Sequence, residues 1–217
     1  MILLVGYPGA GKSTFAGQFI YNSASRYGTK CVYACFSETK ETFFRNMLRF
    51  GWDFERLERE RRVSILDLAV TREAGIQANL NTMMETMNSF NASILVIDSF
   101  TAISMALKES IDARIMVHLF YRFLKKIHCT SIFITDKPWG STSIGEGVTE
   151  FLADAIIHLE TYFDESEAFR RRLRILKMRG TNHTKTPHEY DITNRGFVIL
   201  EKKLLEEKKP TRAKKSA

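Results

Sequence analysis

The feature that most constrains this chain is a glycine-rich octapeptide between an apolar run and a second run of mainly helix-forming residues. Residues 6–13 read Gly-Tyr-Pro-Gly-Ala-Gly-Lys-Ser and match the pattern G-x-x-x-x-G-K-S/T. Residues 1–5 are all apolar and predict a buried strand, and residues 14–21 predict a helix. Strand, loop and helix in this order are the context in which the pattern forms a phosphate-binding loop.

The chemistry of such a loop explains its residue types. Glycine lets successive backbone N–H groups turn inward around a phosphate, because no Cβ blocks the required angles. A helix starting at Lys12 points the positive end of its dipole at the same phosphates. Lys12 supplies a charge for the β- and γ-phosphates, and we expect it to be a surface-loop cation. The predicted nucleotide-binding residues of the loop are Gly6, Tyr7, Pro8, Gly9, Ala10, Gly11, Lys12, Ser13 and Thr14.

Strand and helix patterns alternate along the chain, which predicts an α/β fold with a mostly parallel sheet covered by helices on both faces. Strands are expected at residues 30–36, 63–66, 94–97, 131–135, 156–160, 172–178 and 197–200. Helices are expected at residues 39–50, 74–90 and 113–128, and a long loop at 136–147. We expect one domain over residues 1–200, followed by a basic, disordered tail over 201–217.

Composition excludes several classes of protein. Apolar residues make up 44% of the chain, yet no run approaches the length of a membrane span, so no membrane association is expected. Cys31 and Cys35 lie about 13 Å apart on one predicted strand and cannot bridge each other. Three cysteines in all, with Cys129 alone, favour a reducing, cytoplasmic setting. The net charge is +7, of which the tail carries +4, so the tail is a solubilising segment or a contact for nucleic acid.

Two acidic residues are expected beside the loop, each at the carboxyl end of a strand. Asp98 ends the apolar run 94–97, and a carboxylate there can hold Mg²⁺ opposite the Ser13 hydroxyl. Glu38 follows the second strand, where a carboxylate can orient and deprotonate water for attack on a γ-phosphate. The alternative for Glu38 is a solvated acid at a helix start.

With these residues in place, the chain resembles the KaiC/RadA-like group of RecA-fold ATPases. The matching segments cover almost the whole chain to about residue 200. They are residues 6–14, 36–39, 50–53, 96–99, 147–154 and 175–183. The strings Phe-Gly-Trp-Asp at 50–53 and Lys-x-Arg-Gly-Thr-x-His at 177–183 are the most distinctive.

The resemblance implies a homo-oligomeric ring, usually a hexamer, with ATP and Mg²⁺ bound between neighbouring subunits. It also implies that Lys177 and Arg179 reach the γ-phosphate of the adjacent subunit as catalytic cations, with His183 close to the nucleotide. The alternative is an ordinary exposed basic face on an edge strand. Four arginines upstream are expected to be solvated, with an interface position as the alternative: Arg170, Arg171, Arg172 and Arg174.

Two departures from the family pattern bear on activity. The family has two adjacent glutamates after the second strand, whereas this chain has Ser37 before Glu38, so hydrolysis is expected to be slow or regulatory. The family also has a glycine-rich segment before the first strand, and this sequence begins at that strand.

We therefore expect a Mg²⁺-dependent ATPase with a regulatory or recombination-linked role, whose partners are its own copies and a signalling or recombinase protein. One alternative is a recombinase paralogue that binds single-stranded DNA through the loops at about 104–112 and 137–147. Lys137 and Trp139 supply a cation and a stacking aromatic in the second loop. A less favoured alternative is a small-molecule kinase, against which the family strings argue.

Overall fold

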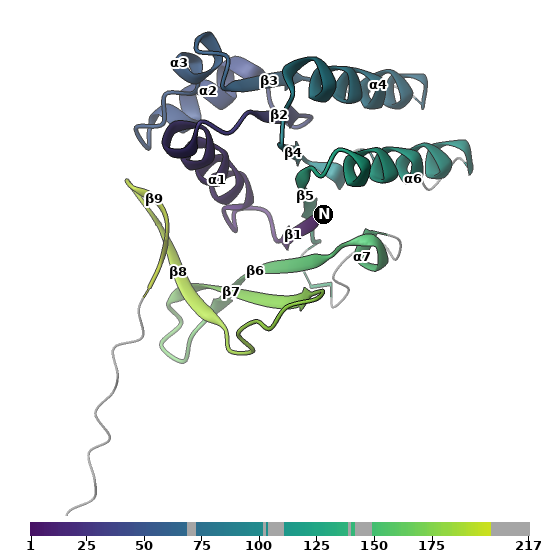
Figure 1. Ribbon diagram of the computed structural model, residues 1–217. Coiled ribbons are helices and arrows are strands. Elements are labelled where there is room, and N and C mark those ends of the chain that lie inside the picture. The colour runs from purple at the N-terminus through teal and green to yellow at the C-terminus, as the bar shows by residue number, and fades with distance from the viewer. Residues whose placement is uncertain (69–72, 102, 104–110, 139, 142–148, 201–217) are drawn as a thin grey trace, which may run out of the picture.

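The computed structural model describes residues 1–68, 73–101, 103, 111–138, 140–141 and 149–200 (Figure 1). A nine-stranded sheet forms its centre, in the order β3-β2-β4-β5-β1-β6-β7-β8-β9. The strands are β1 (Ile2–Gly6), β2 (Cys31–Cys35), β3 (Val63–Asp67), β4 (Ile94–Asp98), β5 (Thr130–Asp136), β6 (Ala155–Phe163), β7 (Phe169–Met178), β8 (His188–Thr193) and β9 (Gly196–Ile199).

Six neighbouring strands, from β3 to β6, are parallel, and the last three run antiparallel to their neighbours. The parallel strands read as continuous apolar runs because both of their faces are buried, as in Cys31–Cys35, where all five residues are buried. Their carboxyl ends meet at one edge of the sheet, since Gly6 pairs with Asp136 and Cys35 pairs with both Asp67 and Asp98.

Helices cover both faces of the parallel part, as predicted (Figure 1). The first face carries α1 (Lys12–Tyr27), α2 (Lys40–Leu48) and α3 (Phe54–Arg59), and the second carries α4 (Glu73–Phe90) and α6 (Ile111–Lys126). The short helix α7 (Thr149–Leu152) precedes β6. Local signals set the helix ends: the Thr39 side chain caps α2, Asp53 caps α3, and Gly28 ends α1 with a left-handed backbone.

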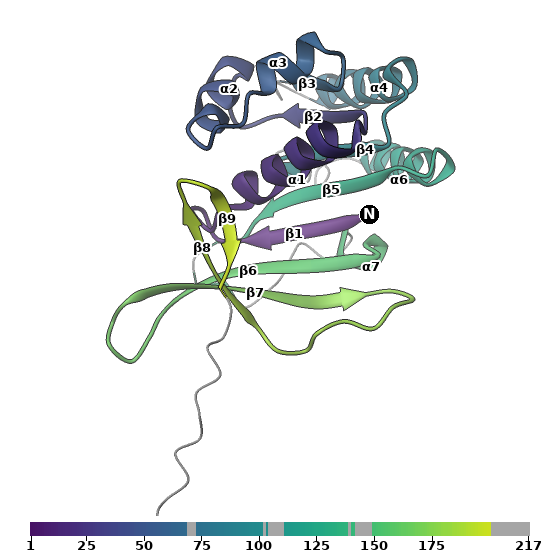
Figure 2. The same cartoon turned by 60° about the vertical axis from the view of Figure 1, so that its left-hand side comes forward.

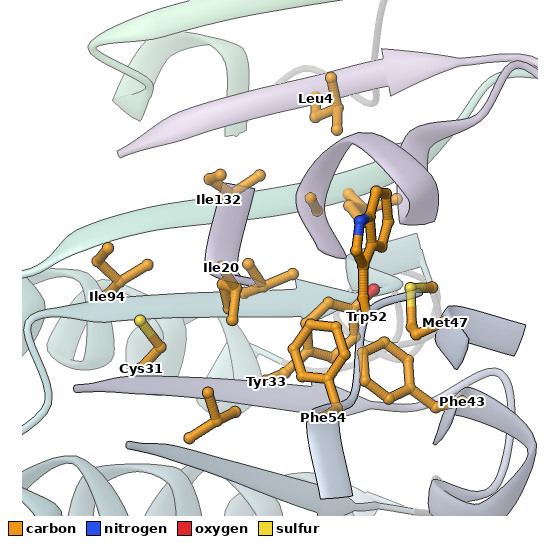
Figure 3. Close-up of a cluster of buried hydrophobic side chains, with 14 of the residues drawn as sticks. Leu4, Ile20, Cys31, Tyr33, Phe43, Met47, Trp52, Phe54, Ile94 and Ile132 are labelled. Carbon is orange, nitrogen blue, oxygen red and sulfur yellow. The ribbon is translucent and has the colours of Figure 1, made fainter. Parts of the chain in front are cut away.

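The core on the first face is rich in aromatic residues (Figure 3). Tyr33 of β2 lies 4.5 Å from Phe43 of α2, and Phe43 lies 4.9 Å from Phe54 of α3, between ring centroids. Met47 and Trp52 join this cluster and pack toward α1, where a Cβ on Gly17 would fall 2.8 Å from the Met47 sulfur. This packing fixes α1, and hence the loop before it, against the sheet.

The β8–β9 hairpin returns to α1 and lies beside it in both views (Figures 1 and 2). Gln18 of α1 bonds the backbone of Phe197 at both ends of its amide, at 2.7 and 3.0 Å. The rings of Phe15 and Phe197 meet edge to face at 5.1 Å. The last strands of the chain therefore complete the environment of its first loop.

The predicted α/β architecture is confirmed, with three differences in detail. Strand β8 and helices α3 and α7 were not predicted, because β8 is polar at alternate positions and the two helices are only six and four residues long. The predicted long loop at 136–147 and the tail at 201–217 fall wholly or partly outside the described residues. Among the helices in the described part of the chain, none has the length and apolar character needed to span a membrane.

Candidate nucleotide-binding site

The glycine-rich loop lies at the carboxyl edge of β1 and leads directly into α1. Gly9 and Gly11 have left-handed backbones, with φ of 82° and 87°, which side chains rarely allow. Gly6 is restricted by packing, because a Cβ there would fall 2.6 Å from the Leu159 carbonyl oxygen. The loop is thus a backbone cradle at a helix N-terminus, which suits an anionic phosphate.

Strand β8 holds this loop from the side. The Tyr190 hydroxyl donates to the Ala10 carbonyl oxygen at 2.6 Å, and both residues are buried. The Ile192 side chain lies against Gly11, so that a Cβ on Gly11 would collide with it. Ile192 also lines the cleft over the loop, which has a volume of about 410 Å³.

Lys12 is buried, which corrects the expectation of a surface-loop cation. It is only 6% exposed, because its side chain folds back over its own loop. The ammonium donates to the carbonyl oxygens of Gly6 at 3.0 Å and Tyr7 at 2.9 Å. It also lies 2.9 Å from Asp136 Oδ1, at the end of β5. A phosphate in the loop would compete with these partners for the same ammonium.

Ser13 and Asp98 lie together, as a magnesium site requires. The Ser13 hydroxyl donates to Asp98, and the Tyr33 hydroxyl donates to Asp98 Oδ2 at 2.7 Å. Burial raises the pKa of Asp98, and these two hydrogen bonds oppose the rise. Among the described residues no three His, Cys, Asp or Glu side chains form a metal cluster. One carboxylate and one hydroxyl facing a phosphate cleft fit Mg²⁺, which takes its other ligands from phosphate and water.

Glu38 lines an adjoining cleft of about 460 Å³ together with Ser13, Ser37 and Asp98. Asn46 of α2 donates to Glu38 Oε2 at 2.9 Å and so orients the carboxylate. Partial burial raises the pKa of Glu38, the Asp98 charge raises it further, and the Asn46 hydrogen bond lowers it. A held carboxylate with a raised pKa is suited to accept a proton from water.

Lys177 and Arg179 lie at the other edge of the sheet. Met178 pairs with Ala155, which pairs with Ile2 at the amino end of β1, whereas the loop begins at the carboxyl end of β1. Both cations donate to the end of α7: Lys177 to the Glu150 carbonyl oxygen at 2.8 Å, and Arg179 to that of Phe151 at 2.7 Å. Both side chains therefore lie at the amino edge of the parallel strands, away from the loop of their own chain.

The remaining predicted cations have varied surroundings. His183 follows β7 and is half-buried, with Nδ1 2.9 Å from the Thr184 carbonyl oxygen. The four upstream arginines are not simply solvated, because each lies against a carboxylate. Arg170 pairs with Asp164, Arg171 with Asp191, and both Arg172 and Arg174 with Glu160.

Of the two residues expected to contact single-stranded DNA, Trp139 lies outside the described residues, and Lys137 is buried.

Sequence reasoning missed four residues that shape this site: Tyr33, Asn46, Asp136 and Tyr190. Tyr33, Asp136 and Tyr190 contact a loop or acidic residue that is far away in sequence. Asn46 lies on a helix and belongs to no motif. The one available signal was Asp136, which ends an apolar strand run just as Asp98 does.

Comparison with known proteins identifies the family of this chain. The family model described as "ATPase: KaiC" matches residues 1–204. The chain belongs to the KaiC ATPase family. The UPF0273 protein MJ1359 of Methanocaldococcus jannaschii is 32% identical, with 94% of this chain and 89% of the relative covered.

Other KaiC family relatives match at similar identity. The circadian clock oscillator protein KaiC of Synechococcus elongatus is 31% identical over 91% of this chain, which covers 40% of that longer protein. The crystal structure of the KaiC-like protein PH0186 from Pyrococcus horikoshii superposes with a TM-score of 0.81 at 31% identity. The alignment covers 92% of this chain and 88% of that one, which confirms the predicted fold and family.

Proposed function

We propose that this KaiC family protein is a Mg²⁺-dependent ATPase whose catalytic sites are shared between neighbouring subunits of a homo-oligomeric ring. The observation that carries the proposal is the separation of the loop from the cation pair. The loop and Glu38 lie at the carboxyl edge of the parallel strands, and Lys177 and Arg179 lie at the amino edge. A second copy can bring its cations to the first copy's loop.

In this mechanism the phosphates enter the cleft over the loop and are held by backbone N–H groups and the start of α1. The Lys12 ammonium transfers from the Gly6 and Tyr7 carbonyl oxygens and from Asp136 to the phosphate oxygens. Ser13 and Asp98 would hold Mg²⁺, which neutralises charge developing on the transferred phosphoryl group.

Glu38 provides the proton acceptor for the attacking water. Its orientation by Asn46 and its raised pKa keep it able to take a proton at neutral pH. Arg179 and Lys177 of the neighbouring subunit would stabilise the negative charge on the γ-phosphate in the transition state. We propose that turnover is slow, because Ser37 replaces one of the two family glutamates. A slow ATPase of this kind suits a regulatory or recombination-linked role.

The test is to mix two inactive variants. A Lys12→Ala subunit lacks a working loop but keeps Arg179. An Arg179→Ala subunit keeps its loop but supplies no arginine to the site of its neighbour. Mixtures should recover part of the ATP turnover, because some interfaces then pair an intact loop with an intact Arg179. Arg195→Ala serves as a control for removing an exposed cation and should behave like wild type.

Subunit exchange has to be verified by native mass spectrometry before the result is interpreted. Turnover that stays at background at every mixing ratio, with exchange verified, would contradict the shared site. Turnover by an Arg179→Ala protein alone at the wild-type rate would contradict the role of Arg179.

A further inference from the structure

On the second face of the sheet, polar side chains of β5, β6 and β7 lie in one row, which crosses β1 at the apolar Val5. Val5 of β1 is in register with Thr135 of β5 and His158 of β6, and His158 is in register with Arg174 of β7. Residues in register point to the same face of a sheet, and Val5 belongs to the core on the α4 and α6 side. This row therefore lies on the face of the sheet opposite to α1.

This row contains buried polar atoms that have no hydrogen-bond partner among the described residues. They include Thr135 Oγ1 and His158 Nε2, and these two residues are 3% and 6% exposed. Buried polar atoms in native proteins are nearly always bonded. Thr135 and His158 come from β5 and β6, the two strands that flank β1, and their side chains face the same side of the sheet.

Lys137 brings a buried cation to the same face. Only 8% of Lys137 is exposed, and its ammonium lies 5.5 Å from the ring centre of Tyr7. Within the described part of the chain its ammonium has no ion pair with a carboxylate. A buried charge of this kind is costly unless a partner of opposite charge completes its environment.

The carboxylate of Glu160, which lies beside His158 on β6, is already shared by three groups. Glu160 contacts Arg172, lies 3.0 Å from Arg174 Nε, and lies 3.2 Å from His158 Nδ1. Positive charge is therefore in excess here. Burial lowers the pKa of His158, and the charges of Lys137 and Arg174 lower it further. The charge of Glu160 raises this pKa.

We propose that Thr135, Lys137, His158 and Arg174 form a second binding site, for a phosphate oxyanion, on the face of the sheet away from α1. An ammonium, a guanidinium and a hydroxyl, together with the imidazole once Nε2 is protonated, supply donors from three strands to one tetrahedral anion. The phosphate belongs either to a free phosphorylated ligand or to a nucleic-acid strand.

This site is separate from the glycine-rich loop but adjoins it through Tyr7. Along β5 the side chains alternate, so Asp136 faces Lys12 while Thr135 and Lys137 face the other side. The Tyr7 carbonyl oxygen accepts from Lys12, and its ring contacts Lys137. The inference does not depend on ATP hydrolysis, because none of its four residues lies in the proposed catalytic site.

The imidazole of His158 is a local reporter of this site. Its Nδ1 faces Glu160, so the neutral ring carries its proton there and Nε2 is unprotonated. A bound phosphate should raise the pKa of His158, because the anion stabilises the imidazolium against Lys137 and Arg174. Phosphate binding should therefore be accompanied by uptake of a proton at His158.

The experiment is an NMR titration of ¹⁵N-histidine-labelled protein with inorganic phosphate, with His158 assigned by a His158→Gln variant. A non-hydrolysable ATP analogue and Mg²⁺ first fill the loop, and the titration is repeated with Lys12→Ala protein. We expect the His158 resonances to shift in a saturable way in both proteins. An analogue that fails to bind wild type would contradict the proposed function alone, since the Lys12→Ala titration still tests this site.

Lys137→Met removes the charge and keeps the length of the side chain. We expect it to weaken phosphate binding at least tenfold. Lys30→Met is the matched control, because Lys30 also lies over an aromatic ring, 5.4 Å from the centre of Phe90, but is exposed. It should leave phosphate affinity within twofold of wild type.

A short single-stranded oligonucleotide without a terminal phosphate distinguishes the two sources. If the oligonucleotide shifts the His158 resonances at a far lower concentration than phosphate does, the natural ligand is a nucleic-acid strand. If only phosphate shifts them, the ligand is a free phosphorylated molecule. No His158 shift with either probe, or an unchanged response in Lys137→Met, would overturn the second site.

Discussion

Asp136 gives the sharpest single test of how the loop is held before nucleotide binds. Its carboxylate pairs with Lys12 at 2.9 Å, and a phosphate has to take over that ammonium. We predict that Asp136→Asn tightens the binding of ATP. The asparagine keeps the size of the side chain and can still accept from Thr101 Oγ1, which lies 3.4 Å from Asp136 Oδ2.

The size of the effect follows from the surroundings of the pair. The Lys12 side chain is 7% exposed but that of Asp136 is 41% exposed, so water screens the interaction. A pair of this kind contributes up to about 1 kcal/mol. Removing the carboxylate also removes its repulsion of the phosphates, about 1 kcal/mol at 4 Å in water. Together these give about 1–2 kcal/mol, or roughly five- to thirtyfold tighter binding.

The assay is calorimetric titration with a non-hydrolysable ATP analogue at fixed salt and Mg²⁺. Asp67→Asn is the control, because Asp67 ends β3 at the same sheet edge but bonds the backbone N–H of Lys40 instead of Lys12. It should change affinity less than twofold. Equal or weaker binding by Asp136→Asn would refute the idea that Asp136 competes with phosphate for Lys12.

Three further predictions concern the base and the DNA alternative. Glu38→Gln should still bind the analogue, while ATP turnover falls roughly 10²-fold or more; unchanged turnover would leave Glu38 as a helix-start acid. Asn46→Ala removes a hydrogen bond that lowers the pKa of Glu38, so the acid limb of the pH–turnover profile should move to higher pH, because the base works only when deprotonated. An unmoved limb would mean that another group titrates. If the loop around Trp139 binds single-stranded DNA, Trp139→Ala should weaken binding by about 1–3 kcal/mol in fluorescence anisotropy, and affinity should fall steeply with salt; no anisotropy change at low salt would remove this alternative.

The parts of the site that were predictable from sequence are those fixed by local chemistry. The loop needs glycine at positions of left-handed backbone, and Gly9 and Gly11 have that backbone. Parallel strands bring their carboxyl ends to one edge, so Asp98 and Glu38 had to lie near Ser13. These inferences needed only the order of strands and helices.

The unpredicted parts depend on pairings between distant segments. Tyr33 faces Asp98 because β2 pairs with β4, and nothing near Tyr33 in the sequence marks that contact. The ion pair of Lys12 depends on Asp136, which is brought close by the pairing of β1 with β5. Local patterns predict which residues form a strand but do not specify every partner of its side chains.

The change of strand direction after β6 explains why one chain cannot complete its own proposed site. Strand β6 runs parallel to β1, so β7 has to run back and deliver Lys177 and Arg179 to the edge where β1 begins. Strand β8 then reverses again and brings Tyr190 to the loop. Substitutions near residue 178 should therefore impair a neighbour's turnover, whereas substitutions near residue 190 should impair nucleotide binding by the same subunit.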